Sequence, residues 1–310
     1  MIATVTLNPC LDKYISVIRL EINETNRSQA VTQYAGGKGL DVSRTVHEMG
    51  GETMAFGFAG GHEGVTLTTL LAHEGVPYSF IPIKDETRSC YIINVSDSSQ
   101  QIRINTPGPG ISIVQVTDLF KRVWELIPAP DILVCGGSVP PGLPCDIYAF
   151  ITKQAREKGI KTILDSSGIF LKEGIKASPF LVKPNIREAE ELLGRPLLSE
   201  NEIVAAAREI TRMGAEIAVI STGKEGLIAA SHNEVVKAVP PQVKALSTVG
   251  AGDSTVAGLA ISFEKNESLL DACRLAVAMG TAAVLTPGTT LARRGDVQNI
   301  IPLVKVEILD

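Results

Sequence analysis

The chain has 310 residues, of which 45% are hydrophobic and 20% charged, and its formal net charge is −5 at pH 7. This length and hydrophobic content suffice for one large α/β domain or two small ones. The negative charge, with no basic cluster longer than Arg293-Arg294, disfavours nucleic acid as a partner. Dispersed cysteines without Cys-x-x-Cys spacing, the lack of a signal-like N-terminus and the lack of an apolar run of roughly 20 residues predict a cytoplasmic protein that does not span a membrane.

Short apolar runs alternate with amphipathic segments along the chain. Strands are predicted, in chain order, at Ile2–Leu7, Thr53–Phe58, Ile132–Cys135, Thr162–Leu164, Phe180–Val182 and Ile217–Ile220. Helices are predicted at Lys38–Met49, Gly64–His73, Val114–Leu126, Cys145–Lys158, Ile186–Leu193, Glu200–Met213, Ala251–Glu264 and Leu269–Leu285. This alternation predicts a doubly wound α/β fold, in which a mainly parallel sheet carries helices on both faces.

Two pairs of segments depart from that alternation because polar and apolar residues follow one another with period two. They are Lys13–Val17 with Arg27–Tyr34, and Ser89–Val95 with Gln101–Asn105, the second pair flanking a predicted hairpin turn at Asp97–Gln100. We therefore expect a small separate sheet, built from about residues 12–34 and 88–106, within a single domain that covers residues 1–310. A lid over an active site and a purely structural flap both agree with this pattern.

Two glycine-rich segments open predicted helices. In Val249-Gly250-Ala251-Gly252-Asp253-Ser254, bare backbone N–H groups at a helix start would bind an anion, and the helix dipole would favour its charge. Asp253 is then either an ordinary carboxylate at a helix N-terminus or a base beside that anion. Gly36-Gly37-Lys38-Gly39 combines glycines, a helix start and a cation, which favours phosphate binding, although the spacing differs from a Walker A loop.

Three further polar segments follow predicted strands, where ligands gather in open α/β sheets. Asp12, shortly after the first strand, would accept hydrogen bonds from ligand hydroxyls or simply belong to a turn. Asn185 and Glu188 lie three residues apart at a helix start, which agrees with water-mediated Mg²⁺ binding and with a capping box. Ser221–Gly226 is a glycine-containing turn, suited to phosphate contact or serving only as a turn.

Four motifs, taken in order, give the whole chain a resemblance to the ribokinase-like, PfkB-type sugar kinases. They are Gly36-Gly37-Lys38-Gly39, Gly137-Ser138-Val139-Pro140-Pro141-Gly142, Lys183-Pro184-Asn185-Ile186-Arg187-Glu188 and Thr248-Val249-Gly250-Ala251-Gly252-Asp253-Ser254. The segments Thr6–Asp12 and Thr87-Arg88, with Lys38, resemble the phosphofructokinase and tagatose-6-phosphate kinase branch. The resemblance implies a ribokinase-like fold with a β-sheet lid, ATP and Mg²⁺ as cofactors, and a homodimer formed through the lid.

The resemblance also implies ATP-dependent transfer of a phosphoryl group to a hydroxyl of a ketohexose phosphate. Asp253 would be the catalytic base, while the amides of Gly250, Ala251 and Gly252 would stabilise the transferred phosphoryl group. The implied contacts with the sugar phosphate are Asp12, Gly37, Lys38, Asp41, Arg88 and Ser138, and those with ATP are Lys183, Asn185, Thr222, Gly223 and Gly226. Glu188 would hold Mg²⁺ through water, and Ser247 and Val249 would bind a monovalent cation such as K⁺.

Asp41 departs from the resemblance, because the family usually has Asn at this position. An ionised Asp only accepts hydrogen bonds, so we expect an altered substrate preference or a protonated Asp41. We favour fructose 1-phosphate as the substrate, with fructose 6-phosphate and tagatose 6-phosphate as alternatives. A kinase for another small alcohol, such as a nucleoside, and a non-catalytic sugar-phosphate-binding protein are the competing hypotheses.

Overall fold

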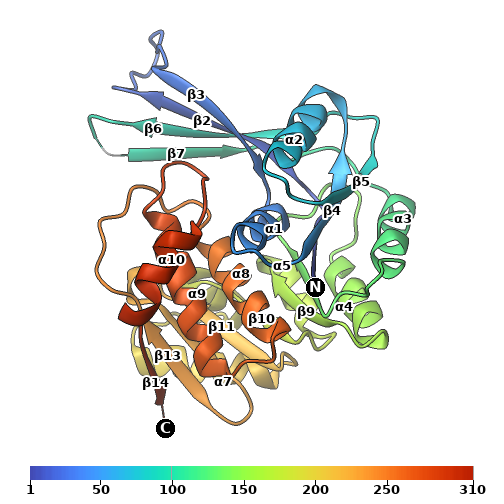
Figure 1. Ribbon diagram of the computed structural model, residues 1–310, viewed down its shortest axis with the longest axis vertical. Coiled ribbons are helices and arrows are strands. Elements are labelled where there is room, and N and C mark those ends of the chain that lie inside the picture. Colours follow the sequence, from blue (N-terminus) through green and yellow to red (C-terminus); the bar gives the residue numbers. More distant parts are fainter. Residues whose placement is uncertain (99, 310) are drawn as a thin grey trace.

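The computed structural model describes residues 1–98 and 100–309, and in this part of the chain the strands form two separate sheets (Figure 1). The larger sheet contains, in spatial order, β14 (Lys305–Leu309), β13 (Val235–Val239), β12 (Leu227–Ala230), β11 (Ile217–Ser221), β10 (Leu181–Val182), β9 (Lys161–Asp165), β8 (Ile132–Gly136), β1 (Ile2–Thr6), β4 (Thr53–Ala59) and β5 (Tyr78–Pro82). The seven strands from β11 to β5 in this order are all parallel to one another. Strands β12, β13 and β14 extend the other edge of the sheet, and each of them pairs in antiparallel fashion.

The order of the parallel strands reverses at β1. From β1 the chain continues to β4 and β5 on one side, and later returns to β8 and β9 on the other side. The carboxyl ends of β1 and β8 therefore lie next to each other, with helices leaving in opposite directions. Such a switch point leaves a crevice at the carboxyl edge of the sheet, which positions a ligand site there.

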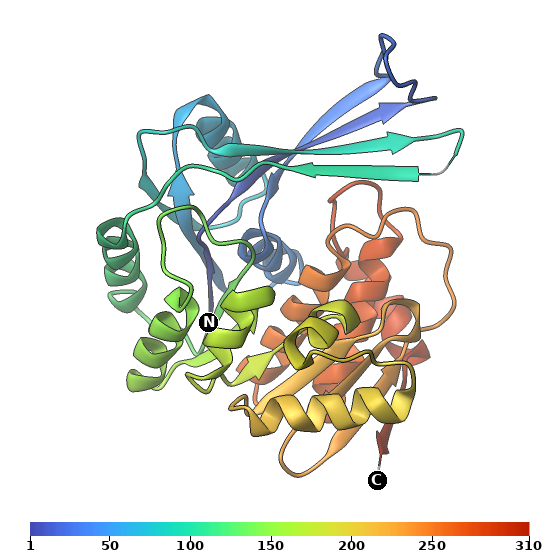
Figure 2. The ribbon, with the colours of Figure 1, turned by 180° about the vertical axis from the view of Figure 1, so that it is seen from behind.

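Helices cover both faces of the large sheet, so the predicted doubly wound α/β architecture is confirmed. Figure 2 shows α4 to α7, in green to yellow, on one face, and Figure 1 shows α8 to α10, in orange to red, on the other. The helices are α1 (Lys38–Glu48), α2 (Gly61–His73), α3 (Ile113–Trp124), α4 (Ile147–Glu157), α5 (Gly168–Ile175), α6 (Ile186–Leu193), α7 (Glu200–Arg212), α8 (Ala251–Glu264), α9 (Leu269–Val284) and α10 (Arg294–Ile300), with short 3₁₀ turns at Gly223–Glu225 and Ile301–Leu303.

The two faces have separate hydrophobic cores because side chains alternate along each strand. On β8, Leu133 and Cys135 belong to the core under α3 to α7, while Ile132 and Val134 belong to the core under α1, α8, α9 and α10. Strands buried on both faces are continuously apolar, which is why the periodicity identified the central strands. None of the helices in the described residues is long and apolar enough to cross a bilayer.

The smaller sheet has the order β3 (Ala30–Gly36), β2 (Cys10–Val17), β6 (Arg88–Val95) and β7 (Gln100–Asn105). It stands above the carboxyl edge of the large sheet as a separate layer (Figure 1). The β2–β6 pair is parallel and the two outer pairs are antiparallel. We call this four-stranded sheet the lid. The hairpin turn predicted at Asp97–Gln100 includes residue 99, which lies outside the described residues.

Candidate active site

Helix α8 begins at the glycine-rich segment that the sequence placed at a helix start. Gly250 is the N-cap residue and adopts φ = 78°, a left-handed conformation that favours glycine, and a side chain there would collide with Leu291. The first amides of a helix have no intrahelical acceptor. In the described part of the chain no acceptor is bonded to the N–H groups of Ala251 or Gly252. The start of α8 is therefore suited to an anion.

Asp253 lies half-buried in the first turn of α8. Burial raises the pKa of its carboxyl from 3.8 to about 6, against the opposing attraction of Lys38. An ordinary carboxylate in the first turn of a helix would be stabilised by the dipole and would have a lower pKa. A carboxyl with a pKa near 6 is ionised at neutral pH and still basic enough to accept a proton from a hydroxyl as it reacts.

Asp165, at the end of β9, holds two lysines together beside α8. Its Oδ1 accepts a hydrogen bond from Lys38 Nζ at 2.9 Å and lies 3.5 Å from Lys183 Nζ. Burial alone would raise the pKa of Asp165, but the two ammonium groups lower it. Lys183 also reaches α8, because a Cβ atom added to Gly252 would lie 3.7 Å from its Nζ. These contacts gather three separate segments into one charged centre.

The Gly36–Gly39 motif brings α1 against the end of β1. Gly37, the N-cap of α1, has φ = 123°, and a Cβ atom there would lie 2.7 Å from Cγ2 of Thr6. Thr6 Oγ1 accepts a hydrogen bond from Leu40 N at 3.0 Å, which fixes the first turn of the helix. The same turn places Lys38 beside the segment after β8, where a Cβ atom on Gly137 would lie 3.8 Å from Lys38 Cβ. The motif thus directs the ammonium group into the crevice at the switch point.

Asp41 is buried and has an arginine of its own helix as a partner. Its Oδ1 accepts a hydrogen bond from Arg44 Nη1 at 3.0 Å. Arg44 also pairs with Glu74 at 2.6 and 2.9 Å and donates to the backbone oxygens of Ala35 and Thr289. Burial raises the pKa of Asp41, Arg44 offsets only part of that effect, and the charge of Asp253 raises the pKa further. The sequence did not reveal Arg44, which changes the environment expected for Asp41.

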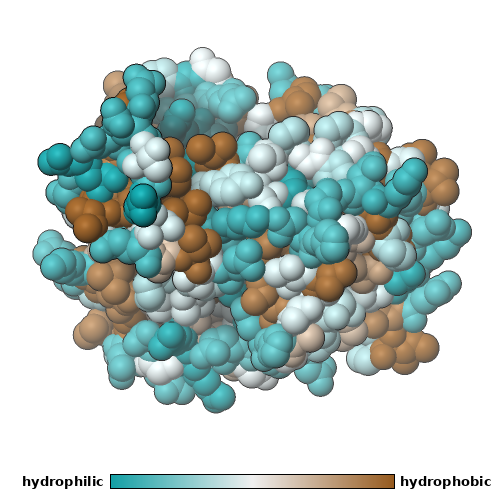
Figure 3. Space-filling view, turned by 90° about the horizontal axis from the view of Figure 1, so that it is seen from above, coloured by the Kyte–Doolittle hydropathy of each residue, from teal (hydrophilic) through white to brown (hydrophobic). Residues whose placement is uncertain are grey.

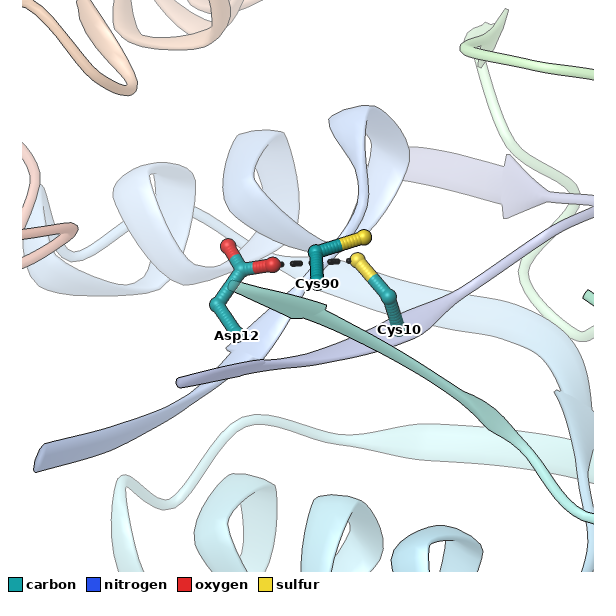
Figure 4. A group of neighbouring side chains, drawn as sticks. All are labelled: Cys10, Asp12 and Cys90. Atoms are coloured by element: carbon teal, nitrogen blue, oxygen red, sulfur yellow. Dashed lines mark hydrogen bonds between the residues drawn. The ribbon is translucent and has the colours of Figure 1, made fainter. Parts of the chain in front are cut away.

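Asp12 projects from β2 beside two thiols, as Figure 4 shows. It is 7% exposed, and its Oδ1 accepts a hydrogen bond from Cys10 Sγ at 3.1 Å. Burial raises the pKa of Asp12. Arg88, predicted to bind the substrate phosphate, donates from Nε and Nη2 to the backbone oxygen of Asn8 and from Nη1 to Thr106 O and Cys90 Sγ. In this structure Arg88 ties the base of the lid to the end of β1.

The residues expected to contact ATP lie at the carboxyl ends of β10 and β11. Asn185 and Glu188 form a complete capping box: Asn185 Oδ1 accepts from Glu188 N at 3.0 Å, and Glu188 Oε2 accepts from Asn185 N at 2.8 Å. The capping box, one of the two interpretations of this pair from the sequence, is therefore present in the structure. Thr222 N donates to Gly226 O at 2.8 Å, which closes the turn that contains Gly223. A side chain at Gly226 would collide with the backbone oxygen of Ala238 on β13, so this position of the turn requires glycine.

Three remaining predicted residues lie around the same crevice. Ser138 Oγ accepts a hydrogen bond from Asn8 Nδ2 at 3.1 Å and so joins the ends of β1 and β8. Ser247 is buried, and its Oγ accepts from Val249 N at 3.2 Å, which shapes the loop before α8. The lid reaches this loop through Arg103, whose Nη2 donates to Thr248 Oγ1 at 3.1 Å.

Sequence reasoning missed Asp165, Arg44 and Arg103. The signal for Asp165 was available, because it directly follows the predicted strand Thr162–Leu164, at the edge where the other polar residues were sought. For Arg44, the i, i+3 spacing from Asp41 on a predicted helix was an available signal, whereas its contact with Glu74, 30 residues away, carries none. The contact of Arg103 with Thr248, which is more than 100 residues away, also carries no local signal.

Comparison with known proteins places the chain among carbohydrate kinases. It matches the pfkB family carbohydrate kinase over residues 5–294. It is 36% identical to the ATP-dependent 6-phosphofructokinase isozyme 2 of Mycobacterium tuberculosis over 303 residues, which cover 97% of this chain and 89% of the relative. It is 34% identical to the 1-phosphofructokinase of Bacillus subtilis, covering 99% of each chain, and 36% identical to the tagatose-6-phosphate kinase of Staphylococcus epidermidis, covering 87% and 88%.

A solved structure agrees with these sequence relatives. Phosphofructokinase-2 from Escherichia coli in complex with potassium superposes with a TM-score of 0.92 at 35% identity, covering 97% of this chain and 98% of that chain. The same protein is known in a tetrameric inhibited form, with a TM-score of 0.91, 35% identity and the same coverage.

Proposed function

We propose a specific reaction for this chain on the premise that it belongs to the pfkB family of carbohydrate kinases, in the phosphofructokinase branch. The reaction is transfer of the γ-phosphoryl group of ATP to a hydroxyl of a ketohexose phosphate, with fructose 1-phosphate as the acceptor and fructose 1,6-bisphosphate as the product. The observation that carries this proposal is Asp253: a carboxyl with a pKa of about 6, in the first turn of α8, beside helix amides that are suited to an anion.

In the proposed mechanism, Asp253 accepts the proton of the sugar hydroxyl as its oxygen attacks the γ-phosphorus. The bond from that phosphorus to the leaving oxygen of ADP breaks, and the migrating group carries negative charge on its oxygens. The amides at Gly250, Ala251 and Gly252 face that negative charge, and the ammonium groups of Lys38 and Lys183 help the amides to stabilise it. Asp165 keeps both lysines in place, since its Oδ1 contacts each of them.

The sugar phosphate is proposed to lie between the lid and α1, in contact with Asp12, Gly37, Lys38, Asp41, Arg88 and Ser138. Asp12 supports this placement, because a buried carboxylate with a single thiol donor would gain stabilising hydrogen bonds from sugar hydroxyls. The 1-phosphofructokinase of Bacillus subtilis matches over nearly the full length of both chains, which agrees with fructose 1-phosphate as the acceptor. Fructose 6-phosphate and tagatose 6-phosphate are the alternatives, because relatives with those names are similarly close.

ATP is proposed to contact Lys183, Asn185, Thr222, Gly223 and Gly226, with Mg²⁺ near Glu188. The donor set fits Mg²⁺, because Glu188 is half-buried, its Oε2 is engaged in the capping box, and its Oε1 accepts no hydrogen bond from the described residues. Mg²⁺ keeps several waters and needs few protein oxygens, and when bound it would neutralise charge on the phosphates of ATP. The carboxylate charge of Glu188 also reaches Lys38, which places it near the charged centre.

A monovalent cation is proposed at the loop that holds Ser247 and Val249, just before α8. The E. coli phosphofructokinase-2 structure is described as a potassium complex. In this chain the loop is tied to the end of α9, because Leu246 N donates to Val284 O at 2.7 Å. A cation bound there would stiffen the segment that leads into the anion-binding amides.

The lid is proposed to pair two copies of the chain. The strand registers align Val31, Ile15, Ile93 and Ile102 in one row across all four lid strands. In this structure Val31 is 55% exposed and Ile102 is 37% exposed, and Ile104 beside them is 51% exposed. Figure 3, which looks down onto the lid, shows hydrophobic residues gathered among hydrophilic ones on that side. An exposed apolar row on a four-stranded sheet favours a second copy as its cover.

The central experiment measures ADP formation with a panel of acceptors: fructose 1-phosphate, fructose 6-phosphate, tagatose 6-phosphate, fructose and adenosine. We expect the highest kcat/KM with fructose 1-phosphate and loss of turnover in Asp253→Asn. No turnover with any ketohexose phosphate would contradict the kinase proposal and favour a non-catalytic sugar-phosphate-binding protein. Turnover only with adenosine would favour a kinase for another small alcohol. ATP-dependent chemistry and the free thiols favour the cytoplasm as the location.

A further inference from the structure

Cys10, Asp12 and Cys90 project from the same face of the lid near its base (Figure 4). Cys10 and Asp12 are two residues apart on β2, so their side chains share one face of the strand. Cys90 on β6 is in register with Asp12, and Arg88 is in register with Cys10. The three potential ligand atoms, two sulfurs and a carboxylate oxygen, all lie within 4.8 Å of one another. The sheet register thus builds a compact group of soft and hard donors.

We propose that Cys10, Asp12 and Cys90 form a binding site for a thiophilic divalent cation such as Zn²⁺, and that the bound cation excludes the sugar phosphate from Asp12. The second half of this proposal rests on the proposed function. Zn²⁺ binds two thiolates and one carboxylate readily, at about 2.3 Å from sulfur and about 2.0–2.2 Å from oxygen, with water in the fourth position. Ligands around such an ion lie about 3.3–3.8 Å apart, so the present group needs only a small contraction.

Burial favours a bound ion over three separate groups. Cys10 and Cys90 are each 4% exposed and Asp12 is 7% exposed, so water can offer few hydrogen bonds to these side chains when no ion is bound. Among the described residues, the Asp12 carboxylate accepts one hydrogen bond, from the weak donor Cys10 Sγ at 3.1 Å. A cation would replace that weak contact with a direct bond to the carboxylate.

Charge balance also favours the site. As Zn²⁺ binds, each thiol releases its proton to solvent, which leaves two thiolates and one carboxylate around the ion. The Arg88 guanidinium lies next to them, with Nη1 at 3.3 Å from Cys90 Sγ. The three negative charges are thus matched by Zn²⁺ and this guanidinium, and the buried group is neutral as a whole.

A disulfide between the two cysteines is a poorer fit. Cys90 is in register with Asp12 rather than with Cys10, so the two cysteines are diagonal neighbours across β2 and β6. In this parallel pair, a strand spacing of about 4.8 Å and a two-residue offset of about 6.6 Å put the two Cα atoms about 8 Å apart. Disulfides usually join Cα atoms separated by about 4.4–6.8 Å. A metal ion bridges the wider separation without moving either strand.

The test uses the reduced full-length chain, without ATP or sugar, under anaerobic conditions. Cys145→Ser removes the exposed thiol and is the background and matched control. Titration with Zn²⁺ against a chromogenic chelator should give one tight site per chain, and Co²⁺ should give thiolate charge-transfer bands. Both signals should be lost in Cys90→Ser and in Cys10→Ser, and Asp12→Asn should weaken Zn²⁺ affinity at least tenfold. Circular dichroism verifies that each variant is folded. If Cys10→Ser does not fold, the result with Cys90→Ser decides the test.

Two results would overturn the metal site: absence of a thiolate band in Cys145→Ser, or a band that persists in a folded Cys90→Ser variant. Fructose 1-phosphate should weaken Zn²⁺ binding at least tenfold when present in excess. A thiolate band that depends on Cys90 but is not changed by any ketohexose phosphate would support the metal site. The same result would overturn the exclusion of the sugar phosphate and contradict the proposed substrate contact at Asp12.

Discussion

Replacing Asp253 with Asn tests the proposed base by two measurements that move in opposite directions. The substitution keeps the size of the side chain and removes its charge and basicity. We expect kcat to fall by about 10²–10⁴-fold, the range that a positioned general base contributes. We also expect the protein to become more stable at neutral pH, because the folded structure disfavours the ionised carboxyl.

The size of the stability gain follows from the pKa. The carboxyl of Asp253 titrates at 3.8 when unperturbed and at about 6 in the folded protein. The folded state therefore binds more protons than the unfolded state between these values, and the stability of the wild type falls as pH rises through this window. One pKa unit corresponds to about 1.4 kcal/mol, so Asp253→Asn should gain a few kcal/mol (about 3) at pH 7 and above, and roughly half as much at pH 5.

The assay is urea unfolding of wild type and variant at pH 5, 6, 7 and 8, with kcat measured on the same preparations. Asp271→Asn is the matched control, because Asp271 also lies in the first turn of a helix, α9, on the surface. Its replacement should lower stability by up to about 1 kcal/mol and leave kcat unchanged. A stability difference for Asp253→Asn that is zero or negative at pH 7 would refute the account of its pKa, and kcat within tenfold of wild type would refute its role as the base.

Four further predictions follow from the same geometry. The kcat/KM of the wild type should increase with pH through about 6 as Asp253 ionises, and a flat profile from pH 5 to 7 would contradict this. Asp165→Asn should lower kcat at least tenfold and the free energy of unfolding by about 3 kcal/mol, because it leaves the ammonium groups of Lys38 and Lys183 facing each other. Asp118→Asn is the control, because Asp118 forms an exposed pair with Lys121, and it should change neither quantity. Asp41→Asn should retain or increase activity on fructose phosphates, while Arg44→Met should destabilise the chain by about 3–5 kcal/mol in urea unfolding; a clear loss of activity in Asp41→Asn would show that Asp41 has a role of its own. Ile102→Lys should shift the chain from dimer to monomer in analytical ultracentrifugation, and a monomeric wild type would contradict the proposed lid pairing.

The sequence predicted which segments lie together at the candidate site because the rule behind it is geometric. Parallel strands have their carboxyl ends at one edge, so polar residues after different strands must meet there. Lys183 and the turn after β11 were found by this rule, and the isolated bridge between Asn185 and Ser221 shows that the two segments are adjacent. The alternating segments of the lid were found by the equally simple period of a half-exposed strand.

Other features depend on partners that no local pattern reveals. The edge strand β14 was missed because it follows α10 and pairs with residues about 70 positions earlier, such as Val235 with Leu309. Strands β12 and β13 were also missed, although each pairs with a strand close by in the chain. The pair Asn185 and Glu188 supported two interpretations at once, because a capping box and a metal-binding carboxylate require the same residue types at the same spacing. Only the hydrogen bonds show that one oxygen of Glu188 is used by the cap.

The four buried or half-buried carboxyls of the centre are distinguished by their partners rather than by their sequence context. Asp165 has Lys38 at 2.9 Å and Asp41 has Arg44 at 3.0 Å. Within the described residues, Asp12 and Asp253 have no cation within ion-pairing distance, and burial is the leading cause that raises the pKa of each. A carboxylate desolvated without a cation lowers stability, so keeping two of them at one crevice requires a compensating use. Hydrogen bonds from sugar hydroxyls at Asp12 and proton transfer at Asp253 would be such uses. The loss of either carboxyl should therefore lower activity without lowering stability.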